Sequence, residues 1–93
     1  MTLDLAPTNT TLWAGCEVVE LAGKATLRTP PEEAISHLAA NLRALPIDPD
    51  EVTLTGSMAI WAYLVAFHAL HGRTRHIYYQ DGRGTRVLVA AHG

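Results

Sequence analysis

The chain of 93 residues has a single cysteine, Cys16, which excludes an intramolecular disulfide. It shows no signal peptide, and these two absences together predict a protein of the reducing cytoplasm. Its longest apolar stretch is about 15 residues, shorter than the ~20 that a helix needs to cross a bilayer. We find no internal repeat and no low-complexity segment. The sequence therefore predicts one small cytoplasmic domain over residues 1–93 that does not associate with a membrane.

Positive charge is scarce in most of the chain and gathers near its end. Residues 1–71 hold three lysines and arginines against eight acids, whereas residues 72–93 hold four arginines against Asp81 alone. A locally basic end on a small domain is typical of a protein that meets an anionic ligand. Charges that merely keep strand ends solvated would give the same pattern, so charge alone leaves both interpretations open.

Local patterns in the first half predict strands followed by a helix. Alternation over residues 2–5 favours an edge strand, and a β-prone run over 11–27 favours one long or two short strands. Thr29 and Glu32 have the spacing of a capping box at a helix start, with prolines suited to the first turn. Pro46 predicts where that helix ends.

The second half predicts a short strand at 52–54, then an almost wholly apolar helix over 57–71 that ends before Gly72. Residues 76–80 and 85–91 read as two strands of a hairpin. The last five residues of the second strand are continuously apolar, which predicts a central strand covered on both faces.

The predicted fold class is therefore α/β, a single small two-layer domain in the order β-(β)-α-β-α-β-β with a C-terminal hairpin. The helix over 57–71 carries more apolar surface than one small sheet can cover. We therefore expect a homodimer that forms through this helix or the adjacent sheet. Trp61 and Tyr63 are better explained as core or interface residues than as platforms for stacking bases.

Candidate site residues lie at the ends of these elements. Gly56 and Ser57 form a strand-to-helix turn whose free amides and hydroxyl suit a phosphate, although Ser57 as a simple helix cap would explain the sequence equally well. His68 and His71 share a helix face, a spacing that is weak evidence for a metal site. His71 in the last turn is placed where the helix dipole favours its protonated form, as a general acid needs.

The hairpin turn Asp81-Gly82-Arg83-Gly84 combines an acid with an arginine, whose forked set of N–H donors can bind a phosphate. Turns also need aspartate and glycine for structural reasons, however. If the hairpin pairs symmetrically, His92 lies about 25 Å from this turn. His71 precedes the first hairpin strand and belongs to the His92 end. One copy therefore cannot bring all four groups to one small ligand, and joint action would need copies stacked end to end.

At these residues the segment 55–92 resembles the small CRISPR-associated Csx-type ring nucleases of type III systems. The shared features are a glycine turn, a Trp-bearing apolar helix ending in His71, an Asp-x-Arg turn at Asp81 and Arg83, and a valine-rich strand ending in His92. The family's arginine and proline before the helix are absent here. Residues before 55 agree with the family in general element order alone.

The domain is CARF-like or ferredoxin-like in size, and the resemblance implies that it acts as a ring nuclease, a hydrolase of antiviral defense. Its partner would be cyclic tetra-adenylate, a cyclic oligoadenylate second messenger, and not duplex DNA. Manganese would be the cofactor, and a second dimer would close over the ligand. The implied catalytic residues are His71, Asp81 and Arg83; the ligand-binding residues are Gly56, Ser57, Arg83 and His92; the metal ligands are Asp81 and His71.

In the implied reaction, Arg83 binds the scissile phosphate and stabilises its developing charge. Asp81 holds the metal or activates the attacking oxygen, His71 protonates the leaving oxygen or assists the metal, and His92 positions the ligand or the metal. Three alternatives stay open: a sensor or sink that binds cyclic oligoadenylate without turnover, a structural dimerisation module, and a metal-dependent RNA exonuclease.

Overall fold

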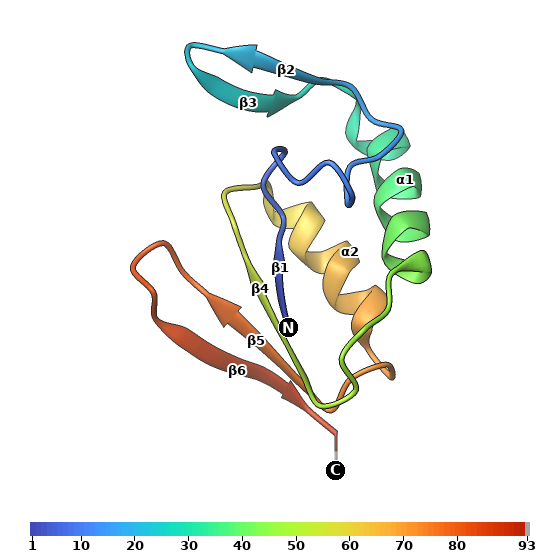
Figure 1. Ribbon diagram of the computed structural model, residues 1–93, viewed down its shortest axis with the longest axis vertical. Helices are drawn as coiled ribbons and strands as arrows, with labels where there is room; N and C mark the ends of the chain where they lie inside the picture. Colours follow the sequence, from blue (N-terminus) through green and yellow to red (C-terminus); the bar gives the residue numbers. More distant parts are fainter. Residues whose placement is uncertain (93) are drawn as a thin grey trace.

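The computed structural model describes residues 1–92, and its two helices pack against a four-stranded sheet (Figure 1). The sheet consists of β1 (Thr2–Asp4), β4 (Glu51–Thr55), β5 (His76–Gln80) and β6 (Arg86–Ala91). The helices are α1 (Pro31–Ala44) and α2 (Ile60–Leu70), and β2 (Val18–Leu21) and β3 (Lys24–Leu27) form a separate hairpin. The predicted α/β class and its element order are confirmed.

The strand order explains why both helices share one face of the sheet. The order is β1-β4-β5-β6, with the first three strands parallel and β6 antiparallel to β5. The two crossovers, β1 to β4 and β4 to β5, step in the same direction. Because such crossovers are right-handed, both place their helix on the same side, and α1 and α2 become neighbours.

The core lies between these helices and the sheet. On α2 every fourth residue is buried, and two of these three are alanines that let α1 approach closely. The sheet contributes Val52, Leu54 and Ile77, all at most 3% exposed. The residues of the helix pair that face this core are Ala34, Leu38, Leu42, Ala62, Ala66 and Leu70.

Two local predictions for the first half were wrong in detail. Residues 10–16 form turns rather than a strand, because Trp13 is buried there and its indole donates to the Leu5 carbonyl (3.0 Å). The predicted capping box does not form. Pro30 occupies the cap position, while the Thr29 hydroxyl accepts a bond from the Glu17 amide (2.7 Å).

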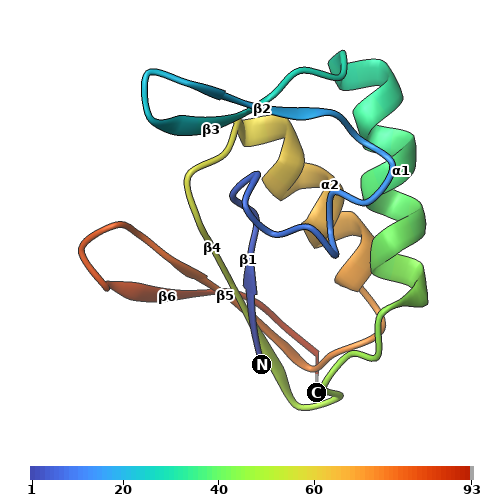
Figure 2. The ribbon, with the colours of Figure 1, turned by 45° about the horizontal axis from the view of Figure 1, so that its top comes forward.

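The hairpin β2–β3 projects beyond the sheet near the start of both helices (Figure 2).

The prediction that the last strand is central was also wrong. β6 is an edge strand, and Val87, Leu88 and Val89 each remain about half exposed. A continuously apolar strand normally has cover on both faces. Among residues 1–92, however, no strand pairs with the outer edge of β6, and α2 covers the neighbouring strands of the sheet rather than β6 itself. Apolar surface at this edge is therefore left without a partner among the described residues.

Candidate functional site

His71 and His92 lie together at one end of the molecule, as predicted. Their rings contact edge to face with centroids 4.5 Å apart and planes at 77°. His71 caps the C-terminus of α2, and Gly72 follows with a positive φ of 87°, which turns the chain toward β5. The His92 amide donates to the Arg75 carbonyl (2.7 Å) and fixes the end of β6 beside this turn.

A small hollow of about 270 Å³ lies beside His92 and contains residues that the sequence interpretation did not select. Arg73 is structural, because its guanidinium donates to two carbonyls at the end of α1, those of Leu42 (2.8 Å) and Leu45 (2.7 Å). Thr74 is 4% exposed and its buried hydroxyl finds no partner among residues 1–92. Arg75 is exposed and lines the hollow; the local excess of arginine was the signal that pointed to it.

Asp81 and Arg83 lie beyond the other end of β5, as predicted. One carboxylate oxygen of Asp81, Oδ1, accepts bonds from the amides of Arg83 (2.9 Å) and Thr85 (3.0 Å). This oxygen is used to hold the turn, so Oδ2 is the atom left for a metal or a proton. The turn thus presents a carboxylate and the Arg83 guanidinium from a fixed backbone.

Gly56 and Ser57 share this end of the sheet, but the predicted helix start was wrong. α2 begins at Ile60 after Ala59, three residues later than predicted, so Ser57 does not cap it. Gly56 has a positive φ of 108°, and a Cβ there would lie 2.1 Å from Oδ1 of Asp4. The glycine therefore serves close packing against β1 rather than approach of a ligand.

A groove of about 680 Å³ opens between α2 and the β5–β6 hairpin, and both Ser57 and Gly82 reach its rim. Tyr63 supports it: the hydroxyl donates to the Gly56 carbonyl, and the ring packs edge to face on Tyr79 at 5.4 Å. Burial raises the pKa of Tyr63, and the neighbouring Tyr79 and Asp4 raise it further. The hydroxyl is therefore held as a donor.

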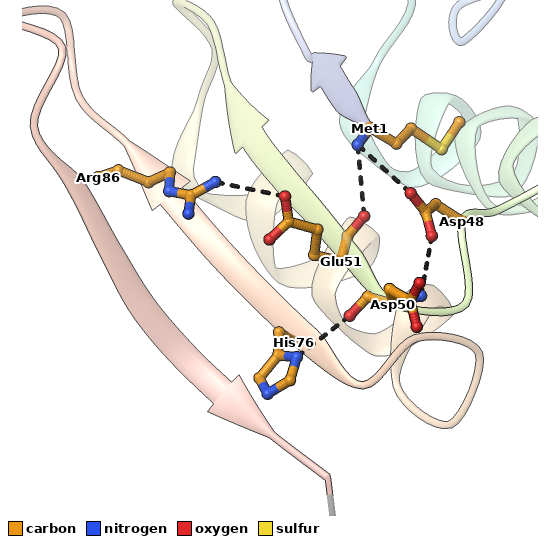
Figure 3. Close-up of polar contacts among 6 residues, drawn as sticks. All are labelled: Met1, Asp48, Asp50, Glu51, His76 and Arg86. Atoms are coloured by element: carbon orange, nitrogen blue, oxygen red, sulfur yellow. Dashed lines mark hydrogen bonds and ion pairs between the residues drawn. The ribbon is translucent and has the colours of Figure 1, made fainter.

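Polar contacts lie along β4 and β5, among them the ion pair of Arg86 with Glu51 (Figure 3). There the Arg86 guanidinium lies 3.8 Å from the centre of the Tyr78 ring and 3.7 Å from a carboxylate oxygen of Glu51. Nδ1 of His76 contacts the Asp50 carbonyl oxygen at 3.2 Å. Among the arginines of residues 72–92, Arg73 is hydrogen-bonded to carbonyls and Arg86 is paired with Glu51, whereas the guanidinium groups of Arg75 and Arg83 have no hydrogen bond or ion pair within residues 1–92.

The predicted metal ligands Asp81 and His71 are separated by the length of β5. Within residues 1–92 no three side chains of histidine, cysteine, aspartate or glutamate gather as a metal-binding group. His71 and His92 supply two imidazoles at one end, and a carboxylate stands at the other. Imidazole and carboxylate are donor types that a divalent ion accepts, but a single copy does not bring these groups together.

Comparison with protein-family models, with curated proteins and with solved structures gives no match to this chain. None of the helices within residues 1–92 has the length and apolar character needed to traverse a bilayer.

Proposed function

We propose that this protein is a metal-dependent phosphodiesterase that degrades cyclic tetra-adenylate to linear products and so ends type III CRISPR signalling. One observation carries the proposal. The four groups that such a reaction requires are divided in pairs, with His71 beside His92 at one end and Asp81 beside Arg83 at the other. Each pair is held by its own backbone contacts, and stacking two copies end to end would join them.

In the proposed site the hairpin turn of one copy meets the histidine pair of the next. Arg83 would bind the scissile phosphate, and its lack of an ion pair within residues 1–92 supports this role. Oδ2 of Asp81 would complete a set with the two imidazoles of the other copy. A divalent ion such as manganese would supply charge stabilisation at the phosphate when bound there. His71 has two alternative roles: it would hold the metal with Asp81, or it would leave the metal to Asp81 and His92 and donate a proton to the leaving oxygen.

Complementation between inactive variants tests this arrangement. His71→Ala and Asp81→Asn each remove one half of the joint site, and we expect neither protein alone to cleave cyclic tetra-adenylate in the presence of manganese. In an equal mixture, random stacking makes about one junction in four intact, so activity returns to about a quarter of wild type. A mixture as inactive as its components contradicts the shared site, and a wild type that forms no linear product contradicts the activity itself.

A second candidate function, binding of the cyclic oligoadenylate without turnover, is favoured by the turn before α2. This turn lacks the arginine and proline of the ring nucleases, and Gly56 is packed against Asp4 with its carbonyl engaged by Tyr63. Fewer groups are then free to orient the scissile phosphate for cleavage at the turn. A titration of the wild-type protein with cyclic tetra-adenylate, followed by analysis of the products, separates the two functions: a binder gives saturation with intact ligand.

A further inference from the structure

The outer edge of β3 is an unpaired strand edge that faces a groove. β2 and β3 form a two-stranded sheet, so no strand of residues 1–92 pairs with the far side of β3. A groove of about 520 Å³ lies on this side, between β3 and the start of α2, and no residue of β2 lines it (Figure 2). We call it the β3 groove: residues 24–31 form one wall, and Ser57, Met58, Ala59 and Trp61 form the other.

The hydrogen-bond pattern of the hairpin turns backbone groups of β3 toward this groove. Bonded and non-bonded residue pairs alternate along an antiparallel ladder. The Arg28 amide donates to the Glu17 carbonyl (2.8 Å), so the next pair, Val18 with Leu27, is not bonded. The same alternation leaves Ala25 without a backbone bond to β2. The N–H and C=O groups of Ala25 and Leu27 therefore point away from β2, and no backbone hydrogen bond outside the hairpin engages them within residues 1–92.

We propose that the β3 groove binds an extended acidic segment of another protein, which adds to the hairpin as a third strand. The N–H and C=O groups of Ala25 and Leu27, two residues apart, are the set of donors and acceptors that strand addition uses. β3 is four residues long, so the paired part of the partner would extend over roughly 13 Å. This inference goes beyond the proposed phosphodiesterase activity and does not depend on it.

Charge selects an acidic partner. Lys24 on β3 and Arg28 just after it are the charged residues of the groove lining, which holds no aspartate or glutamate. Side chains alternate along a strand, so both cations lie on one face. Lys24 has no ion pair within residues 1–92, and the pair of Arg28 with Glu17 is weak because both side chains are exposed (69% and 63%). Carboxylates on this face of an added strand would meet two cations, whereas a basic segment would be repelled.

The opposite face of β3 offers apolar contacts. Ala25 and Leu27 lie on that face. Leu27 packs against the core, as do Met58 and Trp61 on the far wall of the groove. The Trp61 ring is held edge to face on Trp13, with centroids 5.9 Å apart. Every second residue of an added strand would point toward this wall, so the groove favours a segment in which apolar residues alternate with acids.

The test is the binding of a short labelled peptide that alternates glutamate and valine, measured by fluorescence anisotropy. We expect saturable binding below about 1 mM peptide, and binding weaker by about tenfold or more when lysine replaces glutamate. Methylation of the backbone nitrogens on the pairing edge of the peptide keeps its charge but removes its N–H donors. Absence of binding by the unmethylated peptide overturns the proposal, as does equal affinity for the methylated one.

A proline on each edge of the hairpin gives a matched pair of variants. Ala25→Pro removes an outward N–H of β3 without a loss of hairpin bonds, and it should weaken peptide binding by about tenfold or more. Glu20→Pro is the control, because Glu20 pairs with Ala25 and its N–H also points outward, but on the edge that does not line the groove. Circular dichroism confirms folding of each variant. Equal losses in the two variants, or none in either, overturn the proposal.

Reversal of the charge at Lys24 separates a peptide from a nucleic acid. Lys24→Glu should weaken peptide binding by about fivefold, whereas Arg43→Glu, the same change of charge on α1 outside the groove, should leave it unchanged. An oligouridylate is the competing probe, because Trp61 with two cations also suits single-stranded RNA. Binding of this RNA that Lys24→Glu abolishes and Ala25→Pro leaves intact, with no binding of the peptide, overturns the proposal in favour of a nucleic-acid site.

Discussion

The two ends of the β5–β6 hairpin differ in what holds their polar residues. At the turn end, Asp81 is fixed by bonds to the backbone of its own turn, and Arg83 projects from it without an ion pair within residues 1–92. At the histidine end, two rings contact each other and the chain is tied to α1 through Arg73. The difference indicates that hydrogen bonds within the turn itself hold Asp81 and Arg83 in place, whereas the position of the two histidines depends on contacts between distant parts of the chain.

The largest effect expected from this difference concerns Arg83 and Arg75. In the proposed site Arg83→Ala should lower kcat for cyclic tetra-adenylate by about 100- to 1000-fold, because a donor to the developing phosphate charge is lost. Arg75→Ala, at the histidine end, should mainly raise KM, by about tenfold or less. Steady-state kinetics measures both. Equal losses of kcat in the two variants would remove the distinction between the ends.

Gly56 and Gly72 both have a positive φ, and replacing each by alanine allows the costs in stability at the two ends to be compared. Gly56→Ala at the turn end should cost about 3 kcal/mol or more, since its Cβ would lie 2.1 Å from Oδ1 of Asp4 in addition to the positive φ. Gly72→Ala at the histidine end has a φ of 87° but nothing within 4 Å of the added carbon. It should cost about 1 kcal/mol. Urea unfolding compares them, and equal costs would contradict the close packing at Gly56.

Two substitutions of Asp81 separate its contribution to the stability of the turn from the contribution of its charge to activity. Asp81→Ala removes the acceptor of two backbone N–H groups and should destabilise the protein by about 1–2 kcal/mol. Asp81→Asn keeps an acceptor oxygen at that position but removes the charge. We expect it to retain most of the stability while phosphodiesterase activity falls as far as in the alanine variant. Thermal unfolding and product analysis on the same samples check this pair.

The smallest expected effect is that of Tyr63, which supports the turn end through Gly56. Tyr63→Phe should cost about 1 kcal/mol, because the partly buried carbonyl of Gly56 loses its donor. The raised pKa of Tyr63 favours the protonated phenol in the folded state. Its contribution to stability is therefore complete below the ordinary tyrosine pKa of about 10 and declines as the pH rises through the higher folded-state value. Chemical unfolding should be measured for the wild type and for Tyr63→Phe across that alkaline range. The difference between their free energies of unfolding should become smaller as the pH rises.

Much of the candidate site was predictable from sequence because hairpin geometry is local. The separation of Asp81 and Arg83 from His71 and His92 follows from strand length, and the structure confirms it. The start of α2 was not predictable from local signals. Ser57 has the chemistry of a cap, yet contacts of Gly56 with β1 and Tyr63 extend the turn and delay the helix to Ile60.

Sequence alone determined the α/β class and the element order, because hydrophobic period, glycine and proline act within a few residues. It also determined that α2 carries more apolar surface than one sheet can cover. The tertiary structure decided which strand lies at the edge, that β6 is half exposed, and that the uncovered sides of α2 and β6 line one groove. These depend on strand order and helix placement, which arise from packing between residues far apart in the chain.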